Sequence, residues 1–81
     1  MLIKPENWPR IQRILNLSDR ELQIARLVCE GLSNEEISDG QGLSKRTVDA
    51  YVYNIFAILG IRGTNRRVRL VLKLHDLSEQ S

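Results

Sequence analysis

The chain has 81 residues and a formal net charge of +2, with 42% hydrophobic and 27% charged residues. This length fits one domain and leaves no room for a second. Its one cysteine excludes an intrachain disulfide, and one cysteine with one histidine cannot form a structural zinc site. Cys29 lies in an apolar helical pattern, which favours a core residue over a redox sensor. We therefore expect a globular domain of a reducing cytoplasm that needs neither a metal nor a cofactor.

Nothing in the sequence indicates contact with a membrane or export. No apolar run approaches the ~20 residues that a transmembrane helix needs. The first ten residues carry charge and two prolines where a secretory signal would be apolar.

Charge is distributed unevenly along the chain. Residues 14–44 contain two basic and six acidic residues, whereas residues 45–73 contain seven basic residues and one acidic residue, Asp49. A basic half of this kind favours a polyanionic partner, although a charged stretch is more often only a solvated face.

Residues 1–16 are predicted to form an N-terminal arm with at most one short helix. Pro9 suits the first position of such a helix, which would have one apolar edge formed by Ile11, Ile14 and Leu15. Trp8 is interpreted as a staple onto the core rather than as a platform for a ligand.

Two capping boxes predict the next two helices. Ser18 and Glu21 form the first box, which begins a helix that ends near residue 30. Ser33 and Glu36 form the second box, which begins a short helix. This short helix is expected to end near Ser38, because two glycines follow within four residues.

A third helix is predicted over residues 45–59, between Ser44 and Gly60. Apolar residues recur at helical spacing along one side and indicate its buried stripe: Val48, Val52, Ile55 and Leu59. The opposite side combines small, aromatic and charged residues, which suits a contact surface.

A fourth helix is predicted over residues 65–75, with Thr64 as its cap. Its apolar residues fall on two sides, and the domain can cover only one of them. We expect the other side to bind a partner, since an exposed apolar stripe often marks an interface.

A capped helix, a tight break and a second capped helix with basic residues at its start form the layout of a helix-turn-helix. The second helix of this motif enters the major groove of DNA, where its first residues contact base edges. The Ser44 hydroxyl and the free backbone N–H groups at the start of that helix are expected to contact a phosphate.

From Leu17 to Leu77 the chain resembles the LuxR-type (GerE-like) DNA-binding domain. The matching residues follow one another without a gap: Leu17-Ser18-Asp19-Arg20-Glu21, Gly31-Leu32-Ser33-Asn34-Glu35-Glu36-Ile37, Leu43-Ser44, Thr47-Val48, Asn54-Ile55 and Leu59-Gly60-Ile61. The resemblance implies an all-α, four-helix helix-turn-helix fold over residues 17–77, with the arm at 1–16 and a tail at 78–81. It also implies a bacterial transcription regulator that binds double-stranded DNA with its third helix.

The helix pattern and the resemblance together predict the contact residues. DNA contacts are expected at Ser44, Lys45, Arg46, Thr47, Asp49, Ala50, Tyr53, Asn54 and Arg62. Arg66 and Arg67 are expected as secondary phosphate contacts. Family members often dimerise through the fourth helix, so a homodimer is expected, with Leu70, Leu74 and Leu77 at its interface. RNA polymerase or a larger regulator could be a further partner.

Many relatives attach this domain to a receiver or to a small-molecule sensing domain, and neither fits in 81 residues. The chain therefore resembles the stand-alone form of the family, and its initial Met1 favours a complete chain over a fragment.

The chain departs from the family's usual residues at six positions: Gln41, Asp49, Tyr51, Ile58, Thr64 and Arg67. The family usually has a basic residue at the position of Asp49 and a small alanine at the position of Arg67. These departures are expected to alter the DNA sequence preference, the affinity and the dimer face, and to leave the fold intact.

Two alternatives fit part of the pattern, one of them a DNA-binding domain and the other a protein-interaction module. Region 4 of a sigma factor shares the capped helices and the turn, but it ends near its recognition helix, whereas a fourth helix follows Gly60 here. A protein-interaction module that pairs with a larger relative and modulates it would explain Asp49 and the spare leucine stripe.

An enzyme is the class that the sequence favours least. Glu35 and Glu36 are adjacent, so on a helix they point in different directions and cannot flank one substrate. The serines and His75 show no arrangement of a nucleophile with a base.

Overall fold

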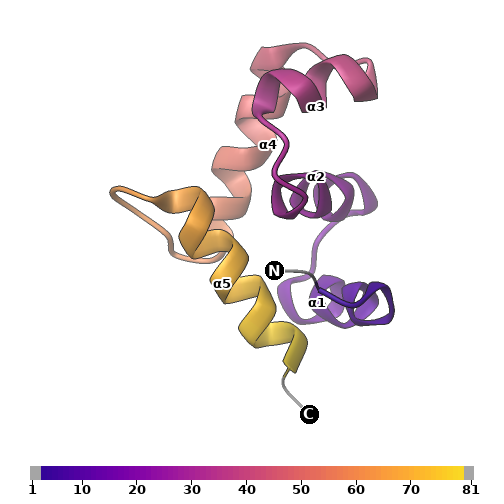
Figure 1. Ribbon diagram of the computed structural model, residues 1–81, viewed down its shortest axis with the longest axis vertical. Helices are drawn as coiled ribbons and strands as arrows, with labels where there is room; N and C mark the ends of the chain where they lie inside the picture. Colours follow the sequence, from indigo (N-terminus) through magenta and orange to yellow (C-terminus); the bar gives the residue numbers. More distant parts are fainter. Residues whose placement is uncertain (1–2, 80–81) are drawn as a thin grey trace.

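The computed structural model describes residues 3–79, and every regular element within them is a helix. In chain order these are the 3₁₀ helix η1 (Pro5–Asn7), α1 (Trp8–Leu15), α2 (Asp19–Cys29), α3 (Asn34–Gln41), α4 (Lys45–Ile58) and α5 (Arg66–Glu79). The helices α1, α2 and α3 follow one another along the long axis, while α4 runs from α3 past α2, and α5 lies beside α1 (Figure 1). The predicted all-α fold is confirmed, with α1 as the short N-terminal helix.

Both predicted capping boxes are present. The backbone N–H of Glu21 donates to Ser18 Oγ at 3.1 Å, and the backbone N–H of Ser18 donates to Glu21 Oε1 at 2.8 Å. Ser33 and Glu36 repeat this pair of bonds at the same distances. The backbone donor at the cap holds the pKa of each glutamate below its usual value, so both carboxylates stay charged at neutral pH.

The break after the second box lies later than expected. The helix α3 does not end near Ser38 but continues through Gly40 to its last residue, Gln41. Gly42, where φ is +66°, is its C-cap. A glycine inside a helix costs only about 1 kcal/mol relative to alanine, which is too little to end a helix by itself. Gly42 ends it because the left-handed backbone there suits glycine.

The core draws on every α-helix. Its largest fully buried side chains are Ile11, Ile24, Ile37, Val48, Ile55, Leu70 and Leu74. Trp8 is also buried, which confirms its assignment to the core. The described part of the N-terminal segment therefore packs with the rest of the domain, whereas Met1 and Leu2 of the expected arm, and residues 80 and 81 of the expected tail, lie outside the described residues.

The helix α5 corrects two expectations about the C-terminal part. It begins at Arg66 rather than at Asn65, whose φ of +56° is left-handed, and it continues past His75 to Glu79. Leu70 and Leu74 are fully buried inside the chain, because α5 packs against α1 and α2. They cannot form the surface of a dimer, so their assignment to that interface is wrong, and Leu77 is itself half-buried against the core. The exposed apolar side chains of α5 are Val68 and Leu72.

Candidate nucleic-acid interface

The helix α4 begins with a side-chain cap that leaves its first backbone N–H groups open. Ser44 Oγ accepts the N–H of Thr47 at 3.1 Å and donates to Thr47 Oγ1 at 2.9 Å. The Ser44 hydroxyl, expected on a phosphate, is therefore already engaged within the protein. An anion at this helix start would meet backbone N–H groups and the positive end of the helix dipole.

The predicted DNA contacts gather on one outer face. Positions 45, 46, 49, 50, 53 and 54 repeat at the spacing of one helix side, opposite the buried Val48 and Ile55. Asp49 is half-buried, and the other predicted contacts are exposed: Ser44, Lys45, Arg46, Thr47, Ala50, Tyr53, Asn54 and Arg62. A shallow hollow of about 460 Å³ runs along this face between Arg46 and Asn54, beside Ala50. The structure thus brings the predicted residues together on one accessible surface, which we call the α4 outer face.

The one acidic residue of the basic half is bound on both sides. Lys45 Nζ lies 3.2 Å from Asp49 Oδ2, and Asn34 Nδ2 donates to Asp49 Oδ1 at 2.8 Å. The Asn34 amide and then the Lys45 ammonium hold the pKa of Asp49 below its usual value. Asp49 is therefore a charged acceptor at neutral pH, and it partly neutralises the lysine beside it.

A second acidic side chain also reaches this face. Asn54 Nδ2 donates to Glu21 Oε2 at 2.6 Å, so a predicted DNA contact is tied to the capping carboxylate of α2. The two residues are 33 positions apart. No sequence pattern signalled this second role of Glu21, because the box at Ser18 already explained it.

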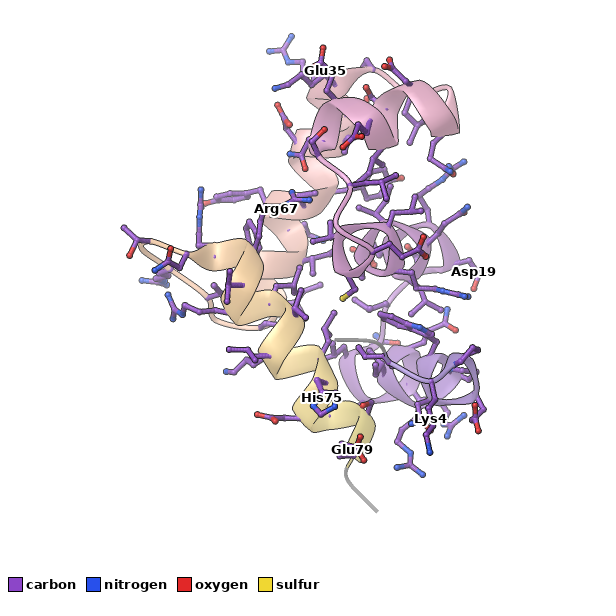
Figure 2. The ribbon with its side chains drawn as sticks, viewed as in Figure 1. Lys4, Asp19, Glu35, Arg67, His75 and Glu79 are labelled. Carbon is purple, nitrogen blue, oxygen red and sulfur yellow. The ribbon has the colours of Figure 1, made fainter. Side chains whose placement is uncertain are left out.

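Arg67 does not point toward the solvent. Its guanidinium donates to Asn34 Oδ1 at 2.7 Å and to the carbonyl oxygen of Leu32, and the side chain is half-buried. In Figure 2 it extends from α5 toward the segment that leads into α3. The guanidinium that was expected as a secondary phosphate contact is therefore committed to the protein, and sequence analysis missed its partner Asn34.

The positive character of the surface continues beyond the end of α4. Arg62 and Arg66 line a hollow of about 420 Å³ together with Tyr53. The Arg66 guanidinium lies 5.1 Å from the centre of the Phe56 ring, a cation–π distance that leaves its outer side accessible. Basic groups therefore stand at both ends of the α4 outer face.

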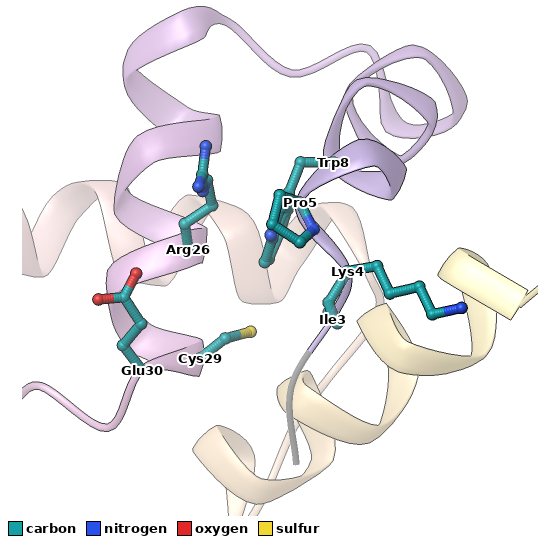
Figure 3. Close-up of a pocket in the computed structure, with 7 residues that line it drawn as sticks. All are labelled: Ile3, Lys4, Pro5, Trp8, Arg26, Cys29 and Glu30. Atoms are coloured by element: carbon teal, nitrogen blue, oxygen red, sulfur yellow. The ribbon is translucent and has the colours of Figure 1, made fainter.

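A separate hollow of about 410 Å³ lies between the N-terminal segment and α2 (Figure 3). Cys29 lines it, and Arg26 stacks on Trp8 at 5.7 Å from the ring centre. Burial raises the pKa of the Cys29 thiol to about 11, so the thiol stays protonated at neutral pH and is a poor nucleophile. The half-buried cysteine has the environment expected of a structural residue.

Residues 3–79 contain neither a cluster of metal-ligating side chains nor a membrane-spanning helix. No three histidine, cysteine, aspartate or glutamate side chains in this part of the chain are grouped as metal ligands. None of its helices is both long enough and apolar enough to span a bilayer.

Comparison with known proteins identifies a family and several relatives that the chain resembles. The family described as "Bacterial regulatory proteins, luxR family" matches residues 15–72. The Response regulator UvrY of Escherichia coli (strain K12) is 38% identical over 58 residues, which are 72% of this chain and 27% of that protein. The Fimbriae Z protein of the same strain is 49% identical over 45 residues, or 56% of this chain and 21% of the relative. The Probable transcriptional regulator ycf29 of Guillardia theta is 35% identical over 48 residues, covering 59% and 23%.

The chain spans about a quarter of the length of these curated relatives. No solved structure is significantly similar to it. The family match covers well over half of the 81 residues and includes α2, α3 and α4. The chain therefore belongs to the luxR family of bacterial regulatory proteins.

Proposed function

We propose that this chain binds double-stranded DNA with sequence preference through the α4 outer face, by itself, as a regulator of transcription. Membership of the luxR family implies DNA binding in the regulation of transcription. The observation that carries the finer proposal is the face itself: the basic, polar and aromatic residues of α4 are exposed together on one side of a rigid helix. Such a helix fits the major groove of B-DNA, which is about 12 Å wide.

The proposal gives each group a role. Arg46 and Arg62 bind phosphates, and Lys45 joins them when the duplex competes with Asp49 for its ammonium group. The open N–H groups of the first turn of α4 bind another phosphate. Asp49, Ala50 and Tyr53 face the base edges. The Asp49 carboxylate is an acceptor, the small Ala50 side chain permits close approach, and Tyr53 provides an apolar ring. Thr47 and Asn54 flank these residues.

The proposal includes a homodimer with a corrected interface. Val68 and Leu72 on α5 are 61% and 47% exposed, so they, rather than Leu70 and Leu74, are the apolar contacts that a second copy would cover. A two-fold dimer would require an inverted-repeat site. A regulator of this kind acts on the chromosome, so the proposed function also implies a cytoplasmic location.

The test is selection of genomic fragments by the purified 81-residue chain, followed by sequencing of the bound DNA. The expected result is enrichment of fragments that share a short motif, arranged as an inverted repeat when a dimer binds. Recovery of DNA without any shared motif would contradict sequence preference.

A second candidate is an interaction module that pairs with a larger relative. The observation in its favour is that the carboxylates of Asp49 and Glu21 both lie on or beside the α4 outer face. The same experiment distinguishes the two functions. An interaction module would bind no duplex even at low salt, where basic surfaces bind DNA most strongly.

A further inference from the structure

Three helices are joined by one chain of side-chain hydrogen bonds. Arg67 on α5 donates to Asn34 Oδ1 at 2.7 Å, and Asn34, the first residue of α3, donates to Asp49 Oδ1 at 2.8 Å. Asp49 is the fifth residue of α4. We call this the Arg67–Asn34–Asp49 relay. It connects a half-buried guanidinium to a carboxylate on the α4 outer face.

The relay has a fixed direction because of the chemistry of its members. A guanidinium has only hydrogen-bond donors, and an ionised carboxylate has only acceptors. A side-chain amide has both, an acceptor oxygen and a donor NH₂ group. With Arg67 on its oxygen, the Asn34 amide must turn its NH₂ group toward Asp49. The second bond of the guanidinium, to the carbonyl oxygen of Leu32, holds Arg67 itself in place.

In the unbound chain Asp49 is therefore held at both oxygens. Asn34 binds Oδ1, and Lys45 lies 3.2 Å from Oδ2. The Asp49 side chain nevertheless remains 46% exposed on the α4 outer face, so its free lone pairs are accessible to a ligand. Without such restraint, a carboxylate near DNA would turn away from the phosphates. An acceptor held in advance loses less freedom on binding and discriminates better between donors.

We propose that Arg67 is a positioning residue that sets the base preference of α4 through Asn34 and Asp49, without touching DNA. This inference rests on the proposed function. The base partner of a carboxylate in the major groove is the exocyclic amine of cytosine, which is a donor. The preference that Arg67 controls is therefore for a C·G pair at the position that Asp49 faces.

A direct phosphate contact by Arg67 would behave differently. Removing a phosphate contact lowers affinity for all sequences and reduces the slope of log K against log salt by ~0.9. Loss of the relay leaves this slope unchanged and lowers the base preference at one base pair of each half-site.

The experiment compares Arg67→Ala, Asn34→Ala, Asp49→Ala and the double variant Arg67→Ala/Asp49→Ala with the wild type. Binding is measured on a library of single-base variants of the selected site, at several salt concentrations. Asn34→Ala cuts the relay without changing the charge, and the α3 cap survives because Ser33 provides it. It therefore decides the question even when Arg67→Ala does not fold. Arg66→Ala is the matched control for base preference alone, since it removes the neighbouring positive charge and leaves the relay whole, and the loss of a phosphate contact by Arg66 would lower affinity for all sequences alike.

In the expected result, a base preference of about tenfold in the wild type falls toward onefold in Arg67→Ala, Asn34→Ala and Asp49→Ala at the same base pair. The base preference of the double variant is no weaker than that of Asp49→Ala alone, and Arg66→Ala keeps the base preference of the wild type. A wild type that discriminates while Asn34→Ala discriminates equally well would overturn the inference and leave the proposed function standing. A uniform loss of affinity with a reduced salt slope in Arg67→Ala would also overturn it. A wild-type chain that binds no duplex would overturn both.

Discussion

The two faces of α4 have opposite properties although they share one backbone. Val48 and Ile55 on the inner face are fully buried in the core, whereas Tyr53 on the outer face is 69% exposed. Inner residues are apolar and stabilise the fold, while outer residues are polar, basic or aromatic and contribute little to it. Recognition can therefore change by substitution on one face without loss of the fold. The helix α5 shows the same division between its buried leucines and its exposed Val68 and Leu72.

The largest expected effect comes from a pair of leucines on opposite sides of α5. Leu74→Glu places a carboxylate at a fully buried site, so we expect the chain to unfold. Leu72→Glu lies on the exposed side and should leave a folded chain that is monomeric and binds DNA more weakly. Circular dichroism and sedimentation velocity measure both outcomes. A folded Leu74→Glu variant would contradict the assignment of this side to the core.

A pair on α4 gives a smaller and more graded contrast. Ile55→Ala removes buried methyl and methylene groups and should lower the free energy of unfolding by about 2–5 kcal/mol. Tyr53→Ala should change it by no more than about 0.5 kcal/mol, as surface substitutions do, and should weaken DNA binding instead. Urea denaturation of both variants checks this. Equal losses of stability in the two variants would contradict the assignment of the inner face to the core and of the outer face to DNA binding.

Arg46→Ala tests the electrostatic part of the outer face. Loss of one phosphate contact should weaken binding to all duplexes alike and reduce the salt slope by ~0.9. Arg26→Ala is a suitable control, because Arg26 stacks on Trp8 away from α4. Binding isotherms at several salt concentrations measure both quantities. An unchanged affinity and slope in Arg46→Ala would remove this residue from the interface.

The smallest expected effect concerns the cap of α3. The Ser33 backbone N–H lowers the pKa of Glu36 in the folded chain, so the carboxylate stabilises the fold above its ordinary pKa of about 4.3. This stabilisation is lost as the pH falls through the lowered value. Glu36→Gln should therefore flatten the dependence of stability on pH in the acid range, whereas Glu35→Gln, outside the box, is the control for charge. Thermal unfolding followed from about pH 6 down to about pH 2 tests this.

Local features were predictable from the sequence, and long-range ones were not. The capping boxes depend on residues three apart, and the Lys45–Asp49 pair on residues four apart, so the sequence itself places the partners together. The extent of α3 past Gly40 was missed, because a glycine only weakens a helix and its neighbours decide whether the helix continues.

The errors at α5 and at Arg67 have one cause. Both sides of α5 carry apolar residues, and only the packing of α1 and α2 against it decides that Leu70 and Leu74 are buried. Likewise, Arg67 meets Asn34 across 33 residues, and no spacing in the sequence signals that contact. A single sequence gives the chemistry of such residues but not which of them meet.

The central claim is that the α4 outer face is the surface that binds DNA. The most direct measurement is an NMR titration of the ¹⁵N-labelled chain with the selected duplex, following each backbone amide signal. We expect the largest shifts on residues 44–54 and on Arg62, with small shifts in α1 and beside Cys29. Binding of the duplex with the largest shifts around Cys29 and Trp8, and none on α4, would contradict the claim.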